Sequence, residues 1–155
     1  MMKGIAKYIM VSLMLLPLGC SRPGNGSFSS FTSLPESGWV YGDSIEIMAV
    51  GLDSVGERKL TIGVCHSDEF LYRNLWLEIS YRDRRDSLVR DSINIAMTDD
   101  HGRWLGKGLG ASYQCEVPLP DQADIADSTR IAVRHIMRLD TLRGISKIGI
   151  GVENI

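Results

Sequence analysis

The chain has 155 residues, of which 17 are basic, 19 are acidic and 44% are hydrophobic. This hydrophobic content excludes an intrinsically disordered chain, and the slight acidic excess argues against a nucleic-acid-binding protein, which needs a basic face. The length suits one domain with a buried core.

Residues 1–20 have the features of an export signal that ends in a lipid-attachment cysteine. Lys3 and Lys7 precede an apolar run at residues 8–18, and this run is shorter than the roughly 20 residues that a membrane span needs. The closing Leu-Pro-Leu-Gly-Cys resembles the bacterial lipobox, in which the cysteine is lipidated and becomes the new N-terminus. We predict a lipoprotein signal peptide at residues 1–19 and lipidation of Cys20. The alternative is an ordinary secretory signal with an incidental cysteine.

The segment after Cys20 has the composition of a tether. Without the leader, 15 basic and 19 acidic residues remain, a net charge of −4. Residues 21–30 are rich in Gly, Ser and Pro, which favours a flexible chain. The predicted organisation is a lipidated cysteine and tether at residues 20–38, followed by one domain at residues 39–155. Within the tether, the apolar Phe28, Phe31 and Leu34 are candidates for docking back on the domain.

From Trp39 onward, apolar residues alternate with polar ones in short runs separated by turn-forming residues. The runs that we expect to be strands are residues 44–50, 59–66, 75–82, 92–97, 113–117, 131–138 and 146–153. Alternation with a period of two predicts an all-β fold, an antiparallel β-sandwich of seven to eight strands, preceded by the signal helix. Residues 121–128 are expected to form a loop with at most one helical turn.

Cys65 and Cys115 are the two cysteines that follow Cys20. Cys65 is out of phase with the apolar Ile62 and Val64, whereas Cys115 is in phase with the apolar Val117. The two sulfurs should therefore point to different faces of their strands, and we predict no disulfide. An oxidising compartment leaves a disulfide as the alternative.

The sequence shows no recognisable catalytic or metal-binding pattern. His66, His101 and His135 have no Cys, Asp or Glu at metal-ligand spacing, so each is expected to be hydrogen-bonded in the core or exposed. The glycine-rich residues 106–110 lack the GxxxxGK[ST] pattern of a phosphate loop. Residues 99–102 lack the ligand spacing of a calcium loop and predict a tight turn. We therefore expect no enzyme, no metal site and no cofactor.

The tryptophans carry the clearest binding signal. Trp76 shares a strand face with polar residues such as Glu78, so it is either covered by the segment around Phe31 or open to a partner. Trp104 follows Arg103 in a glycine-rich stretch and is either a structural corner at the core edge or part of a binding loop. We predict Trp76, Arg103 and Trp104 as partner-binding residues.

Five further residues are predicted to shape the loops around these tryptophans: Asn74, Gly102, Gly106, Gly108 and Arg138. Asn74 is expected to hydrogen-bond the loop backbone before its strand. The glycines permit positive φ or a bulge, and Arg138 is expected to be solvated or ion-paired at the sheet surface.

Several motifs occur together as they do in one known family. The segments YRNLWL at residues 72–77, GRWLGKG at 102–108, MR at 137–138 and LRGI at 142–145 resemble the gliding-motility lipoprotein family GldH of Bacteroidetes, over most of the chain from about residue 31 to 153. The resemblance implies a non-enzymatic, lipid-anchored envelope protein with protein partners in a machinery linked to gliding and type IX secretion.

The resemblance also implies a location. In lipoproteins of this phylum, acidic residues soon after the lipidated cysteine tend to mark surface export, and residues 21–30 contain none. We therefore expect attachment to the outer membrane on its periplasmic side. The alternative function is a glycan-binding module, because tryptophans on the polar face of a β-sandwich suit stacking on sugar rings.

Overall fold

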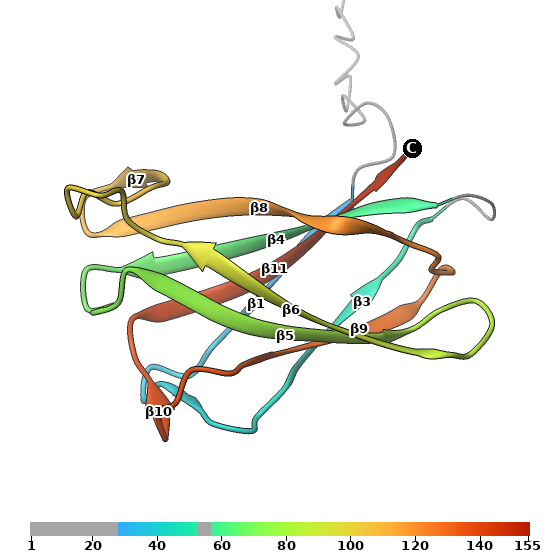
Figure 1. Ribbon diagram of the computed structural model, residues 1–155, viewed down its shortest axis with the longest axis horizontal. Coiled ribbons are helices and arrows are strands. Elements are labelled where there is room, and N and C mark those ends of the chain that lie inside the picture. The colour runs from blue at the N-terminus through green and yellow to red at the C-terminus, as the bar shows by residue number, and fades with distance from the viewer. Residues whose placement is uncertain (1–27, 53–56) are drawn as a thin grey trace, which may run out of the picture.

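The computed structural model describes residues 28–52 and 57–155. The predicted signal peptide, Cys20 and residues 21–27 of the tether lie outside the described residues. Strands form all the regular secondary structure of the described part (Figure 1). Within it, no helix is long and apolar enough to cross a membrane. The strands are β1 (Phe28–Ser33), β2 (Trp39–Val40), β3 (Ile45–Ala49), β4 (Arg58–Ser67), β5 (Asn74–Arg82), β6 (Leu88–Ala96), β7 (Lys107–Leu109), β8 (Ser112–Ala123), β9 (Thr129–His135), β10 (Thr141–Leu142) and β11 (Ile145–Asn154).

The strands build two antiparallel sheets. The first sheet has the order β1-β11-β4-β8-β7, the second has the order β3-β9-β5-β6, and β10 pairs with β2 as a separate ribbon. Figure 1 shows the two sheets as layers along the long axis of the molecule. The predicted antiparallel β-sandwich is confirmed.

The core lies between the two sheets because each strand alternates buried and exposed positions. The pattern is regular in β3 and β5, whose apolar residues are buried at every second position. The largest fully buried side chains are Trp39, Leu60, Ile62, Phe70, Leu75, Leu77, Ile79, Ile95, Met97, Ile131, Leu142 and Ile148. This interior face is what the strand period in the sequence predicts.

The sandwich differs from the sequence-based expectation in three places. Residues 28–33, predicted as tether, form β1 and pair with β11. Residues 121–123, predicted as part of a loop, instead extend β8 to Ala123, and Ser128 then takes a positive φ of 64°. The strands β2, β7 and β10 have only two or three residues, too few for a period to be visible in the sequence.

Phe31 docks on the outer face of the first sheet. Its partner in β11 is Gly149, and Gly149 is paired with Gly63 of β4. A Cβ added to Gly63 would lie 2.6 Å from the Phe31 ring, and one added to Gly149 would lie 2.7 Å from it. The ring therefore lies flat on two glycines, and Phe31 does not cover Trp76, which belongs to the other sheet.

The register defines two ends of the sandwich. Phe28 is aligned with Val152, which is aligned with Leu60, and this row marks what we call the near end. The far end is marked by the row that runs from Ser33 through Lys147, Cys65 and Gln114 to Lys107. The connections at the far end are residues 34–44, 68–73, 97–106, 110–111 and 136–144. All four sequence motifs quoted above for the family resemblance lie in or beside these connections.

Candidate functional site

A cleft of about 1030 Å³ opens between the edges of the two sheets. Strand β6 forms one wall and β8 forms the other, and the segment that leads into β7 closes the far end. The lining residues are Asn94, Ala96, Leu105, Gly106, Lys107, Gln114, Cys115, Glu116 and Val117. The cleft combines polar and apolar walls, and we take it as the candidate site.

The cleft lies between two places where the edges of the sheets are joined. At the near end the backbone N–H of Arg84 donates to the carbonyl of Asp124 at 3.0 Å. The second junction is at the far end. There, Thr98 and Trp104 form a bridge, and the N–H of Leu105 donates to the carbonyl of Met97 at 2.8 Å. The chain then enters β7, which pairs with β8 only as far as Gln114. Beyond this seam β6 and β8 have no strand between them in the described residues, and Figure 1 shows them diverging.

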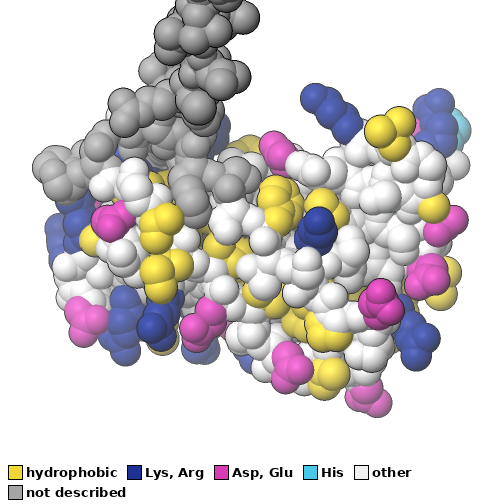
Figure 2. Space-filling view, turned by 180° about the vertical axis from the view of Figure 1, so that it is seen from behind, with side chains coloured by type: hydrophobic (Ala, Val, Ile, Leu, Met, Phe, Trp, Pro, Cys, Tyr) yellow, Lys and Arg dark blue, Asp and Glu magenta, His cyan; other side chains and the backbone are white. Residues whose placement is uncertain are grey.

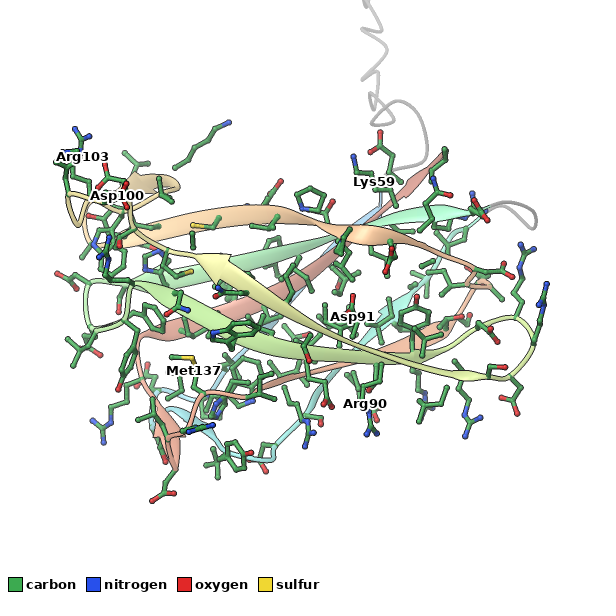
Figure 3. The ribbon with its side chains drawn as sticks, in the orientation of Figure 1. Lys59, Arg90, Asp91, Asp100, Arg103 and Met137 are labelled. Atoms are coloured by element: carbon green, nitrogen blue, oxygen red, sulfur yellow. The ribbon has the colours of Figure 1, made fainter. Side chains whose placement is uncertain are left out.

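Trp76 lies on β5, the strand next to the β6 wall of the cleft. Its partner in β6 is Asn94, a lining residue, and the Trp76 side chain is 41% exposed. The backbone N–H of Trp76 donates to the Met137 sulfur at 3.4 Å, and Figure 3 shows Met137 beside the second sheet. Trp76 is therefore an open aromatic surface next to polar groups, as predicted from strand parity.

Asn74 supports the same wall by a contact that differs from the expected one. Its amide nitrogen donates to the Asn94 side-chain oxygen at 2.9 Å, so it ties β5 to β6 and not to the preceding loop backbone. The contact crosses the strands diagonally, since Asn74 itself is aligned with Ala96. The hydrogen bond fixes the orientation of Asn94 on the cleft wall.

Trp104 belongs to an aromatic cluster that fastens the far end. Its ring lies 4.7 Å from that of His66, and His66 stacks on Tyr113 with a 5.3 Å centroid separation. Phe70 contacts both His66 and Trp104. Trp104 is half-buried and packs on the hydrophobic core. Of the two alternatives, it is therefore a structural corner, and it is not among the residues that line the cleft.

His66 is fully buried within this cluster. Its Nδ1–H donates to the carbonyl of Ser67 at 3.1 Å, while Nε2 has no hydrogen-bond partner among the described residues. Burial lowers the pKa of His66, which the Ser67 hydrogen bond partly offsets. The prediction of a histidine hydrogen-bonded in the core therefore holds for Nδ1 of His66 and not for its Nε2.

Arg103 and Gly102 lie in a tight loop at the far end. The Asp99 carboxylate accepts the backbone N–H groups of His101 and Arg103, each at 2.9 Å, and the Arg103 Nε–H at 2.8 Å. Gly102 has a φ of +79°, which suits glycine. The Arg103 backbone N–H, more than any other group, lowers the pKa of Asp99. Figure 3 shows Arg103 and Asp100 together at this tip.

Gly106 and Gly108 are required by close packing. A Cβ on Gly106 would lie 2.7 Å from the carbonyl oxygen of Gln114, and a Cβ on Gly108 would lie 2.6 Å from the Tyr113 ring. Neither has a positive φ, so close approach to β8 and not backbone conformation selects glycine there. Larger residues would push the β7 segment away from β8 and widen the cleft.

The two thiols lie on different faces of the first sheet. Cys115 is aligned with the buried Val64 and is buried, whereas Cys65 is aligned with Gln114 and half-buried. Both are free, and the Cys115 thiol donates to the carbonyl of Leu105 at 3.0 Å. Burial raises the pKa of both thiols. A high thiol pKa leaves little thiolate, so neither group is activated for nucleophilic chemistry.

The structure therefore divides the predicted site residues into two groups. Gly106 lines the cleft, and Asn74 and Trp76 lie beside the lining residue Asn94. Arg103 and Trp104 belong instead to the far-end loop and its aromatic cluster. Arg138 is exposed in the connection between β9 and β10. Sequence reasoning did not identify the cleft residues Asn94, Ala96, Gln114, Glu116 and Val117. The sequence held one indirect indication of this cleft wall. Pro118 and Pro120 lack a backbone N–H and so indicate that this part of β8 has an unpaired edge.

The surface carries charges of both signs. On the face shown in Figure 2, Lys and Arg side chains alternate with Asp and Glu and with hydrophobic groups. The described ion pairs include Arg134 with Glu78 at 2.8 Å and Arg103 with Asp99 at 2.8 Å. Among the described residues no three His, Cys, Asp or Glu side chains are arranged to hold a metal ion.

Comparison with known proteins identifies the family. The family model described as GldH lipoprotein matches residues 26–152. The chain belongs to the GldH lipoprotein family. A gliding motility lipoprotein GldH homolog from Christiangramia forsetii is 20% identical over 162 residues, covering 99% of this chain and 98% of the relative. No solved structure matches the chain. The resemblance read from the sequence motifs is thus confirmed, and this GldH lipoprotein presents those motifs at the far end of its sandwich.

Proposed function

We propose that this GldH lipoprotein is a non-enzymatic binding subunit of the gliding and type IX secretion machinery. It is anchored by lipidated Cys20 in the outer membrane and faces the periplasm, and its cleft between β6 and β8 receives a protein partner. The observation that carries this proposal is the position of Trp76, which is 41% exposed and is the strand partner of the cleft-lining Asn94. The relative that the chain matches along its length is named for gliding motility.

The fold supports an arrangement in which the membrane does not block the cleft. The row through Phe28 and the row through Gln114 are five residues apart along the strands and three strand steps apart across the sheet. With about 3.3 Å per residue and about 4.8 Å per strand, the separations are about 17 Å and about 14 Å. A lipid anchor ahead of Phe28 therefore attaches at the corner opposite the cleft.

In-cell photo-crosslinking tests the proposal. A photoreactive residue is placed at Lys107, which lines the cleft, and, as a matched control, at Glu153, an exposed position at the near end. We expect a protein adduct from position 107 and not from position 153, with its yield reduced by Trp76→Ala. Equal adducts from both positions, or none from position 107, would contradict the proposal. Loss of membrane partitioning in Cys20→Ala tests the anchor separately.

A glycan-binding module is the second candidate. The cleft is lined by Asn94, Gln114 and Glu116, and Trp76 is the strand partner of Asn94. Amides and a carboxylate suit hydroxyl groups, and an exposed indole suits a sugar face. Envelope polysaccharide binding by the purified lipoprotein, lost in Trp76→Ala and kept in Trp76→Phe, would favour this candidate. Polysaccharide binding that does not change in Trp76→Ala would exclude the cleft as a glycan site.

A further inference from the structure

We propose that the cleft binds an extended segment of a partner protein by strand addition, so that the segment becomes a strand between β8 and β6. This inference rests on the proposed function and specifies the chemistry of the partner. It depends on the backbone of the two cleft walls, on two prolines in β8 and on the charges at the cleft.

The wall formed by β8 has an incompletely paired edge. On one side β8 pairs with β4 along most of its length, whereas on the other side β7 covers only the stretch from Ser112 to Gln114. In an antiparallel ladder, successive residues direct their N–H and C=O groups to opposite neighbours. Pro118, which is aligned with Thr61, has no N–H, so position 118 suits the side away from β4. By the same alternation Glu116 directs its backbone groups away from β4, into the cleft.

The opposite wall is a second strand edge. Within the described residues β6 pairs with β5 from Leu88 to Ala96 and has no partner on its other side. Asn94 and Ala96 bring this edge to the cleft. Each free edge offers N–H and C=O groups at every second residue, a spacing that a polypeptide backbone matches and a sugar does not. One added strand between β6 and β8 would therefore connect the two sheets beyond the far-end junction at residues 97–106.

The prolines and charges define the segment that fits. Pro118 and Pro120 cannot donate to an added strand, so pairing with β8 is confined to a short stretch around Glu116. Opposite charges are favoured across strands. The expected segment therefore has a basic side chain facing Glu116 and an acidic side chain beside Lys107. The Glu116 carboxylate is already oriented on the wall by the Gln114 amide, which donates to it at 2.9 Å.

The test uses the full-length lipoprotein in detergent and a displayed library of random seven-residue peptides as the probe. We expect enriched peptides with the charge pattern above, and hydrogen-exchange protection of residues 92–96 and 114–118 on binding. Glu116→Pro removes one outward N–H and should weaken binding at least about tenfold. Glu116→Gln keeps this N–H and should lose the preference for a basic residue with a smaller loss of affinity.

A second variant covers the case in which Glu116→Pro fails to fold. Ala96→Trp fills the cleft from the β6 wall without changing β8 and should also prevent binding. Enrichment of no peptide, equal binding by wild type and Ala96→Trp, or protection elsewhere would overturn strand addition. If position 107 still crosslinks to a protein in Glu116→Pro as in wild type, strand addition fails while the proposed function stands. If position 107 yields no adduct in wild type, the proposed function itself fails.

Discussion

The ring of Phe31 lies directly over the Cα of Gly63, so that an added Cβ there would be 2.6 Å from the ring. The segment before the predicted domain is thereby joined to the sheet by shape as well as by strand pairing. This contact explains why β1 extends the sandwich and why Phe31 is unavailable to cover Trp76. Glycine at position 63 is selected by the ring above it.

Gly63→Ala should destabilise the domain by about 1–3 kcal/mol, because the new methyl group overpacks against Phe31. In a Phe31→Ala background the same change should be neutral or stabilising, since it then only restricts the unfolded chain. Urea denaturation of the four variants measures the coupling. Gly149→Ala is the matched comparison. Phe31→Ala should not fully remove the cost of Gly149→Ala, because the new Cβ at position 149 would also lie 2.8 Å from the Ser30 carbonyl oxygen. Equal costs of Gly63→Ala in both backgrounds would contradict the account.

Trp104→Ala should destabilise the domain by about 2–3 kcal/mol, below the usual cost for a fully buried tryptophan because Trp104 is half-buried. Trp104→Phe should retain most of the stability, since a smaller ring can still contact His66 and Phe70. Chemical denaturation measures both variants. A loss below about 0.5 kcal/mol for Trp104→Ala, the range of ordinary surface changes, would show that the aromatic cluster does not fasten the far end.

The free energy of unfolding should fall as the pH is lowered from 7.5 to 5.5. Burial lowers the pKa of His66 and of His135, so the unfolded chain binds protons more strongly than the folded one below the ordinary histidine pKa of about 6.5. The stability is therefore complete above this pH and is lost as the pH falls toward the folded-state pKa values. The pH range from 7.5 to 5.5 lies above the ordinary pKa range of carboxylates, so the titration of Asp and Glu contributes little to this change.

Denaturation curves at several pH values measure this dependence. His66→Asn, which keeps a donor for the Ser67 carbonyl, should flatten it, and His135→Asn should flatten it further in combination. An unchanged slope in the double variant would assign the pH dependence to other groups.

Asp99→Ala should loosen the loop at residues 99–103, because two backbone N–H groups and the Arg103 guanidinium lose their acceptor. Limited digestion with trypsin after Arg103 measures the change, and cleavage should be faster than in wild type. Asp99→Asn keeps one oxygen for the backbone groups and should show an intermediate rate. A matched control, Asp100→Ala, removes only the ion pair to Arg73 at 3.6 Å and should cleave as wild type does. Equal rates in all variants would refute the role of Asp99.

Glu78→Gln should cost about 0.5–1 kcal/mol, because Arg134 is partly exposed and its ion pair is screened by water. Arg134 donates to both carboxylate oxygens, at 2.8 and 3.0 Å, and this contact is the main reason that the pKa of Glu78 is lowered. The stabilisation should be present at neutral pH and lost as the pH falls below the ordinary glutamate range. Denaturation at pH 7 and pH 4 distinguishes this from a pH-independent packing effect, which would leave the cost equal at both.

Local patterns in the chain correctly predicted the strands with a clear apolar period, the exposed face of Trp76, the opposite orientations of Cys65 and Cys115, and the family. Each of these follows from local alternation or from a motif, both of which are present in a single segment. Strands of two or three residues, such as β7, carry too few positions for a period to be visible.

The position of the cleft and the role of Trp104 could not be predicted from local patterns. In the sequence Asn94 and Glu116 are ordinary polar strand residues. They line one cleft because the edges of the two sheets lie next to each other in the fold. The glycine-rich stretch around Trp104 does not indicate a packing partner, and the indole packs on the ring of His66, which is 38 residues away along the chain. Contacts between segments far apart in the chain depend on sheet order and register, which a local pattern does not encode.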